Sequence, residues 1–160
     1  MRLDFLALSP AEESPKSKVQ SPKSENGRQE LESGIQYPVS SIRHSALAYI
    51  PFRYIEDSRQ RIEIYRKLAQ VTDKPGLDAL EQELRDRFGP VPPPLQLLLQ
   101  VTEAKVLAAE RGITVIEVQD DRLMLTRDND YVMVGSKFPR LLKKQAGARL
   151  NEIKRQLLAL

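Results

Sequence analysis

Short alternating runs of apolar and polar residues predict the strands of this chain. Leu3, Phe5 and Ala7 recur at every second position, which predicts a strand over residues 2–8. Further along the chain, three β-branched or alternating runs are separated by short polar turns, and they predict an antiparallel meander. These runs cover residues 113–118, 122–126 and 131–135. We expect residues 2–8 to pair into the same sheet as residues 113–134.

A helical repeat of apolar residues lies between these two strand regions. Asp57 or Ser58 is expected as the N-cap, because both side chains can accept hydrogen bonds from the first free N–H groups of a helix. The spacing then predicts a first helix that continues to about Val71. Its apolar face is expected to consist of Ile62, Tyr65, Leu68 and Ala69.

A second helix is predicted over residues 77–88. Gly89 follows it at the position where a helix end favours a positive φ angle, and Pro90 prevents the helix from continuing. We expect Phe88 to anchor the helix end in the core, next to Arg87. The apolar stripe of this helix comprises Leu77, Leu80, Leu84 and Phe88.

The third helix is predicted over residues 93–111, with the broadest apolar face and therefore the deepest burial. After the meander, residues 136–160 predict a short helix and a longer one, divided at Gly147. Together these elements indicate an α+β fold in which about four to five helices pack on a small, mainly antiparallel β-sheet.

Residues 9–34 interrupt this pattern with six serines, three prolines and only three apolar residues. Such a composition cannot bury enough surface to offset the entropy lost on ordering. The expected organisation is therefore a first strand over residues 1–8, a flexible Ser/Pro/Lys-rich insertion over residues 9–45, and one folded body over residues 46–160.

Composition excludes most kinds of catalytic site. The 160 residues include no cysteine and a single histidine, His44, so thiol catalysis, Cys-ligated zinc and nearly all histidine-dependent sites are excluded. Neither GxxxxGK[ST] nor GxGxxG occurs, so no nucleotide-binding loop is predicted. We expect no enzyme activity, no metal and no cofactor. The sequence also has no signal peptide and no long apolar run, which indicates a cytoplasmic protein without a membrane partner.

Two charged surfaces remain as candidate binding sites. Glu83 and Asp86 are expected to form an exposed acidic edge on the second helix. The last 24 residues carry seven basic residues and one acidic residue, and they offer a possible basic surface for nucleic acid. Its candidate residues are Lys143, Lys144, Arg149, Lys154 and Arg155.

Several motifs occur in the order found in one known family. They are AYIPFRYI (48–55), RIEIYRKLA (61–69) and LEQELRDRFGPVP (80–92), followed by a long apolar helix that ends in Gly112 and Ile113. In this order the chain resembles the C-terminal domain of the bacterial transcription-repair coupling factors, from about residue 48 to residue 118. RLDFLAL at residues 2–8 resembles the strand that the family places just ahead of AYIP. By this resemblance, residues 9–45 are an insertion within a C-terminal domain that continues over residues 46–160.

The resemblance implies a function for the whole protein and a different one for this domain. Full-length members are ATP-driven DNA translocases that remove stalled RNA polymerase and recruit the excision-repair protein UvrA. The C-terminal domain is not catalytic. It covers the UvrA-binding module of its own chain in competition with UvrA, and it restrains the motor until polymerase is engaged. RNA polymerase and DNA are partners only through the full-length protein.

The masking role carries over to Glu83 and Asp86, which match the acidic positions of the family's ELxDRFG segment. Arg87, Phe88, Gly89 and Pro90 form the structural motif that ends the helix. The alternative is a small nucleic-acid-binding domain that uses the basic C-terminal helices.

Overall fold

The computed structural model of the protein describes residues 1–8 and 46–160. The predictions for residues 9–45, including the flexible insertion and His44, lie outside these ranges. The described elements, in chain order, are β1 (Arg2–Leu3), β2 (Leu6–Ala7), β3 (Ala46–Leu47), α1 (Ser58–Gln70), α2 (Lys74–Phe88), α3 (Pro93–Glu110), β4 (Ile113–Gln119), β5 (Arg122–Arg127), β6 (Asp130–Val132) and α4 (Ala146–Leu158).

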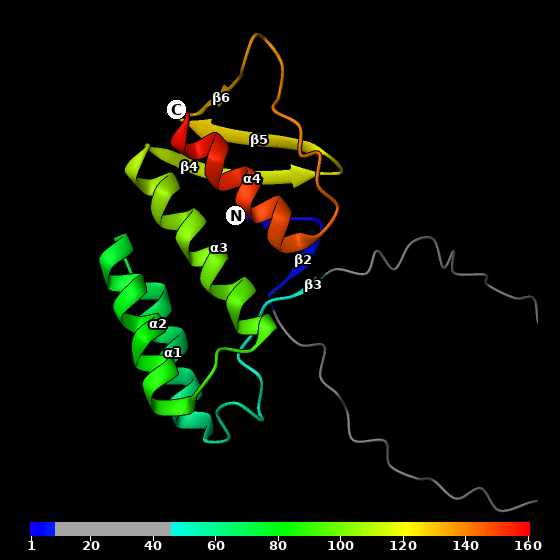
Figure 1. Ribbon diagram of the computed structural model, residues 1–160. Helices are drawn as coiled ribbons and strands as arrows, with labels where there is room; N and C mark the ends of the chain where they lie inside the picture. Colours follow the sequence, from blue (N-terminus) through cyan, green and yellow to red (C-terminus); the bar gives the residue numbers. More distant parts are fainter. Residues whose placement is uncertain (9–45) are drawn as a thin grey trace, which may run out of the picture.

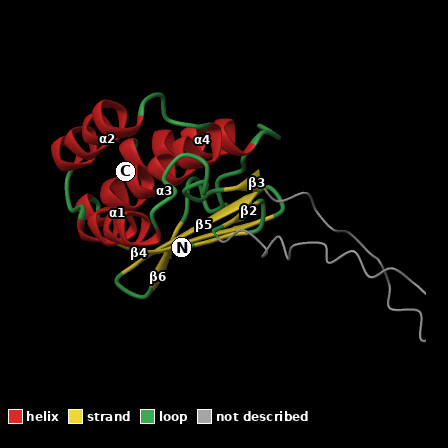
Figure 2. Cartoon of the chain, turned by 90° about the horizontal axis from the view of Figure 1, so that it is seen from below, coloured by secondary structure: helices red, strands yellow, loops and turns green. Residues whose placement is uncertain are grey.

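The four helices gather on one side of the strands (Figure 1, Figure 2). The main sheet has the order β1-β4-β5-β6, in which β4, β5 and β6 form the predicted antiparallel meander. Asp128 and Asn129 join β5 to β6 with φ angles of 51° and 66°, which are the left-handed values of a tight two-residue hairpin turn. The α+β fold class is confirmed.

The N-terminal segment was predicted as one strand, and the structure corrects this. Residues 2–8 divide between two sheets: β1 pairs in parallel with β4, whereas β2 pairs in parallel with β3. A turn at Asp4 and Phe5 separates the two strands. The Asp4 carboxylate accepts a hydrogen bond of 2.6 Å from the Asp120 N–H group, so it holds this turn against the β4–β5 turn. Leu6, rather than Phe5, is the buried residue.

Helix α3 is the central helix of the fold. It packs against α1, α2, α4 and β4 and carries eight buried residues, more than any other helix. Gly112 ends this helical segment with a φ angle of 67° before β4 begins. The prediction that residues 93–111 form the most buried helix is confirmed. Its buried residues are Leu95, Leu98, Leu99, Val101, Thr102, Ala104, Val106 and Ala108.

Only one helix follows the meander, not the predicted two. Residues 137–141 instead run beside the start of β5, where the Leu123 N–H group donates to the Pro139 carbonyl over 2.8 Å. Gly147 lies in the first turn of α4 rather than between two helices. A Cβ atom there would lie 3.4 Å from the Gln100 side-chain oxygen. The glycine therefore allows α4 to approach α3 closely.

The C-terminus of α2 is held by an aromatic contact and a hydroxyl group. The Tyr54 and Phe88 rings lie 5.8 Å apart. The Tyr54 hydroxyl lies 3.0 Å from the Leu84 carbonyl oxygen and 2.9 Å from the Gly89 carbonyl oxygen, so it donates to the backbone at the helix end. Gly89 has the expected positive φ, 86°. Phe88, however, is half-buried, because this helix end lies at the surface.

Truncation of α2 core residues should distinguish the buried stripe from this half-buried end. Leu84 is completely buried, so Leu84→Ala should lower the free energy of unfolding by about 3 to 4 kcal/mol. Phe88→Ala should cost about 1 to 2 kcal/mol, because part of the ring already contacts water. Urea denaturation of both variants measures the difference. Equal losses would contradict the half-buried position of Phe88.

The Tyr54 hydroxyl should contribute measurably to stability. Tyr54→Phe removes the hydroxyl that donates to these two carbonyl oxygens while it keeps the ring contact, so the expected loss is about 1 kcal/mol. Tyr131→Phe is the matched control, since Tyr131 is exposed and its hydroxyl makes no hydrogen bond within the described ranges. Thermal unfolding of both variants should show a lower midpoint for Tyr54→Phe alone.

Candidate interdomain surface

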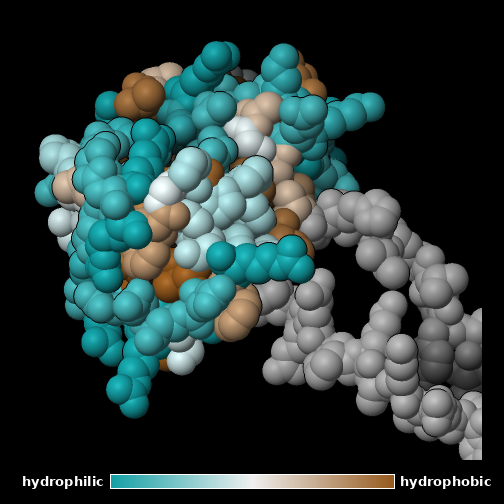
Figure 3. Space-filling model, turned by 60° about the horizontal axis from the view of Figure 1, so that its bottom comes forward, coloured by the Kyte–Doolittle hydropathy of each residue, from teal (hydrophilic) through white to brown (hydrophobic). Residues whose placement is uncertain are grey.

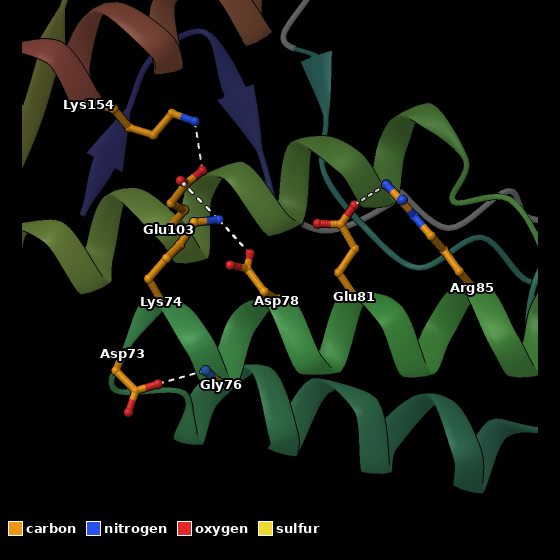
Figure 4. Close-up of polar contacts among 8 residues, drawn as sticks. All are labelled: Asp73, Lys74, Gly76, Asp78, Glu81, Arg85, Glu103 and Lys154. Carbon is orange, nitrogen blue, oxygen red and sulfur yellow. Dashed lines mark hydrogen bonds and ion pairs between the residues drawn. The ribbon is translucent and has the colours of Figure 1, made fainter.

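Helix α2 carries the acidic edge, and both of its ends are fixed by the local sequence. The Asp73 carboxylate accepts a hydrogen bond of 2.7 Å from the Gly76 N–H group and so caps the helix (Figure 4). The helix begins at Lys74, three residues before the predicted start at residue 77, because Pro75 fits the first turn of a helix. Leu77, Leu80 and Leu84 face the core. The acidic residues are therefore on the outside.

Glu83 was predicted on an exposed acidic edge, and it is partly exposed there but also paired with two cations. The Lys67 ammonium group of α1 lies 2.8 Å and 2.9 Å from its two oxygens, and the Arg87 guanidinium lies 2.7 Å from one of them. The hydrogen bond from Lys67, followed by that from Arg87, lowers the pKa of Glu83. Its side chain is 32% exposed. Glu83 thus joins α1 to α2 as well as facing solvent.

Asp86 differs from Glu83 in its partners. It is exposed, and it accepts a hydrogen bond of 2.8 Å from the neutral amide of Gln82. Within the described ranges no cation pairs with it. One turn earlier, Glu81 pairs with Arg85 at 2.5 Å (Figure 4). Asp86 is therefore the carboxylate of the predicted pair that has no cation beside it in the described ranges.

A shallow cleft lies beside Glu83, between the end of α1 and the first half of α2. Its volume is about 380 Å³. Lys67 and Glu83 stand at its polar side, while Val71, Ala79 and Leu80 form its apolar part. This cleft could receive one side chain of a docking protein next to the Glu83 carboxylate.

A second ion cluster fixes the position of α2 on α3. The Glu103 carboxylate lies 2.7 Å from the Lys154 ammonium group of α4 and 3.3 Å from that of Lys74 on α2 (Figure 4). Burial raises the pKa of Glu103, but the two ammonium groups outweigh it, so the pKa is lower than usual. The hydrogen bond to Asp78 and the charge of Glu103 raise the pKa of Lys74. The sequence predictions did not include this cluster. The sequence feature that could have indicated it is an acidic residue, Glu103, in the middle of the most apolar helix.

The predicted basic surface is only partly available. Lys154 is bound to Glu103, with a side chain 17% exposed. The Arg149 guanidinium lies 4.3 Å from the centre of the Phe5 ring and donates to the Asp120 carbonyl. Lys143, Lys144 and Arg155 are exposed. The five residues therefore do not act as one phosphate-facing group.

The ranges 1–8 and 46–160 contain no cluster of three or more His, Cys, Asp or Glu side chains that could hold a metal ion. Across the same described residues, no helix is long and apolar enough to cross a membrane.

Comparison with known proteins identifies the family. A family model described as the TRCF domain matches residues 45–134, more than half of the chain. The chain belongs to the TRCF domain family.

The relatives that match are far longer than this chain. The transcription-repair-coupling factor of Bacillus subtilis (strain 168) is 35% identical over 79 residues, which are 49% of this chain and 7% of that protein. The factor of Staphylococcus haemolyticus (strain JCSC1435) is 39% identical over 70 residues, which are 44% of this chain and 6% of that protein. The matched part of this TRCF domain is therefore a small fraction of these relatives.

A solved structure supports the fold. The crystal structure of the C-terminal domain of a transcription-repair coupling factor superposes with a TM-score of 0.53 at 20% identity. The match covers 69% of this chain and 88% of that one. At this identity the likeness concerns the fold alone.

The Glu103 cluster of this TRCF domain should make its stability depend on pH. The folded pKa of Glu103 lies below its usual value of 4.5, so its stabilisation is complete above that pH and is lost as the pH falls through the folded pKa. Glu103→Gln should therefore cost about 1 to 2 kcal/mol at pH 7 and reduce the loss of stability between about pH 5 and pH 3. Urea denaturation across this range measures both effects.

Glu81→Gln is the matched control, because it removes a carboxylate that faces one arginine on its own helix. It should change stability by less than about 0.5 kcal/mol. If Glu103→Gln left the pH dependence unchanged, Glu103 would not hold α2 and α4 to α3.

Proposed function

We propose that this TRCF domain is a non-catalytic regulatory domain of a longer transcription-repair coupling factor. It docks through the outer edge of α2 onto the UvrA-binding module of its own chain, competes there with UvrA, and restrains the ATP-driven DNA translocase until stalled RNA polymerase is engaged. The observation that carries this proposal is the position of Asp86, an exposed carboxylate without a cation partner in the described ranges, one turn from Glu83.

The charges on α2 suit a docking contact that can open. Asp86 has only a neutral amide as its hydrogen-bond partner, whereas Glu83 already has two cations beside it. A basic partner surface would gain a pair with Asp86 but would have to compete with Lys67 for Glu83. Exposed ion pairs contribute only about 0.2 to 1 kcal/mol each, and pairs half-buried by docking contribute more. A contact of this size supports a closed state that a competing protein can displace.

The alternative, a nucleic-acid-binding domain, has less support. Three of the five candidate residues are exposed, but Arg149 and Lys154 are already engaged within the fold. A basic surface that binds several phosphates gives a steep dependence of affinity on salt. We expect this chain to bind duplex DNA weakly and without such a slope.

The docking proposal predicts the effect of one charge reversal in the full-length coupling factor that carries this domain. Asp86→Arg should raise UvrA affinity and polymerase-independent ATPase activity, each by roughly tenfold, since a repulsive pair replaces an attractive one in the closed state. Titration with UvrA and a steady-state ATPase assay measure these effects. Asp86 has no core contact, so the 160-residue chain should keep its melting midpoint.

Glu110→Arg provides the matched control, because Glu110 is an exposed carboxylate at the end of α3 and outside the α2 edge. It should change neither UvrA affinity nor ATPase activity. Wild-type UvrA affinity and wild-type ATPase activity in a folded Asp86→Arg protein would show that α2 is not the docking surface.

A further inference from the structure

Helix α1 carries an exposed apolar patch that its helical pattern did not predict. Ile62 was expected in the core, but its side chain is 58% exposed, and Ile64 and Leu68 are the buried residues of this helix. Phe52, in the loop before α1, is 63% exposed, and Tyr65 is 37% exposed. Only Ile64 and Leu68 of α1 are buried, so Ile62 and Tyr65 of this helix are exposed, as is Phe52 of the preceding loop.

Two contacts place Phe52 and Tyr65 beside the same part of α1 and the loop before it. The Arg61 guanidinium lies 5.0 Å from the centre of the Phe52 ring, and Arg61 directly precedes Ile62. Tyr65 follows Ile62 at the i+3 position, on the same side of the helix. The Tyr65 hydroxyl accepts a hydrogen bond of 2.9 Å from the Ile50 N–H group, so its ring is fixed beside the loop that carries Phe52.

Arginines surround this patch. Arg59 and Arg66 lie one turn on either side of Ile62, and Arg53 follows Phe52. All three are exposed, and none forms an ion pair in the part of the chain that the structure describes. We call Phe52, Ile62 and Tyr65, with Arg53, Arg59 and Arg66, the α1 outer face.

Nearby acidic residues do not neutralise the α1 outer face. Asp57 uses its carboxylate to cap α1, where it accepts hydrogen bonds from the Arg59 and Gln60 N–H groups. Glu63 lies 3.7 Å from Lys67. Across residues 52–70, five basic residues outnumber the three acidic ones, Glu56, Asp57 and Glu63, so the stretch keeps an excess of positive charge.

The α1 outer face and the acidic edge of α2 belong to different helices, which lie beside each other in both ribbon views (Figure 1, Figure 2). In the space-filling view, small brown and tan hydrophobic areas lie among teal hydrophilic residues on the visible side of the molecule (Figure 3). Exposed apolar areas mark protein contacts when they are contiguous.

We propose that the α1 outer face docks an acidic segment of a protein partner that carries apolar anchor residues. Apolar anchors would cover Ile62 and Phe52, while carboxylates would pair with Arg59 and Arg66. A nucleic acid fits less well, because Ile62 offers no surface for base stacking and Arg61 already covers one face of the Phe52 ring. This proposal does not depend on the docking role of α2.

The test uses the 160-residue chain and a synthetic acidic peptide. The peptide has 16 residues and capped ends, with leucines at i, i+3, i+4 and i+7 and glutamates at the flanking positions. Fluorescence anisotropy should show saturable binding that weakens as salt is raised. A peptide with glutamine in place of glutamate should bind roughly tenfold more weakly, because it loses the pairs with the arginines.

Paired variants locate the binding site. Ile62→Ser should weaken binding of the acidic peptide roughly tenfold, whereas Leu142→Ser, at a residue 83% exposed in the loop before α4, should leave it unchanged. Arg59→Gln with Arg66→Gln should weaken it to a similar extent, whereas Arg122→Gln with Arg155→Gln should not. Circular dichroism verifies that every variant is folded.

Three results would overturn the proposal. The first is absence of peptide binding, or binding that Ile62→Ser does not change. The second is tighter binding of a fifteen-nucleotide oligothymidylate than of the peptide, with loss on Arg59→Gln and Arg66→Gln, which would make the face a nucleic-acid site. The third is self-association of the chain in sedimentation that Ile62→Ser abolishes, which would make a second copy the partner.

Discussion

Burial of α3 is the constraint on which the other elements depend. Apolar residues cover most of the circumference of this helix, and such a helix is stable in water only when other elements surround it. Helices α1 and α2 cover one part of it, and α4 and the first strand of the meander cover another. Each of these elements contributes its own apolar stripe, so the single core spans the helical layer and the sheet.

The charged groups of α2 are outside as a consequence of this packing. Once Leu77, Leu80 and Leu84 face α3, helical geometry places Glu83 and Asp86 away from it. Glu103 then secures the arrangement from the α3 side, because its carboxylate binds one lysine of α2 and one of α4. The core thus determines which acidic residues a partner can reach.

Local patterns identified most of this fold. The antiparallel meander, the Asp57 cap, the Gly89 end of α2 and the deep burial of the third helix followed from spacing and cap residues. The prediction of one continuous strand over residues 2–8 was wrong, because its division between β4 and β3 depends on contacts distant in sequence. Ile62 was assigned to the core because it fits a helical stripe with Tyr65 and Ala69, whereas α1 buries Ile64 and Leu68, which form a stripe at i and i+4.

The candidate site was predicted less completely than the fold. Sequence placed Glu83 and Asp86 on one edge, but it could not reveal that Lys67 lies against Glu83, since the two residues are 16 positions apart on different helices. The same limit applied to Lys154, which was counted as part of a basic surface although Glu103 binds it from 51 positions away. Net charge along a sequence therefore overestimates the charge that a folded surface offers to a partner.

The Lys67–Glu83 pair also connects the two proposed surfaces. Glu83 belongs to the acidic edge of α2, and Lys67 belongs to the helix that carries the α1 outer face. A basic group that docks beside Glu83 competes with Lys67, whose other carboxylate neighbour is Glu63 at 3.7 Å. Loss of the Lys67–Glu83 pair would remove an ion pair between α1 and α2, and the positive charge of Lys67 would stay on α1 beside Glu63. Arg53, Arg59 and Arg66 form no ion pair in the described ranges, so competition for Glu83 would not involve the arginines of the α1 outer face.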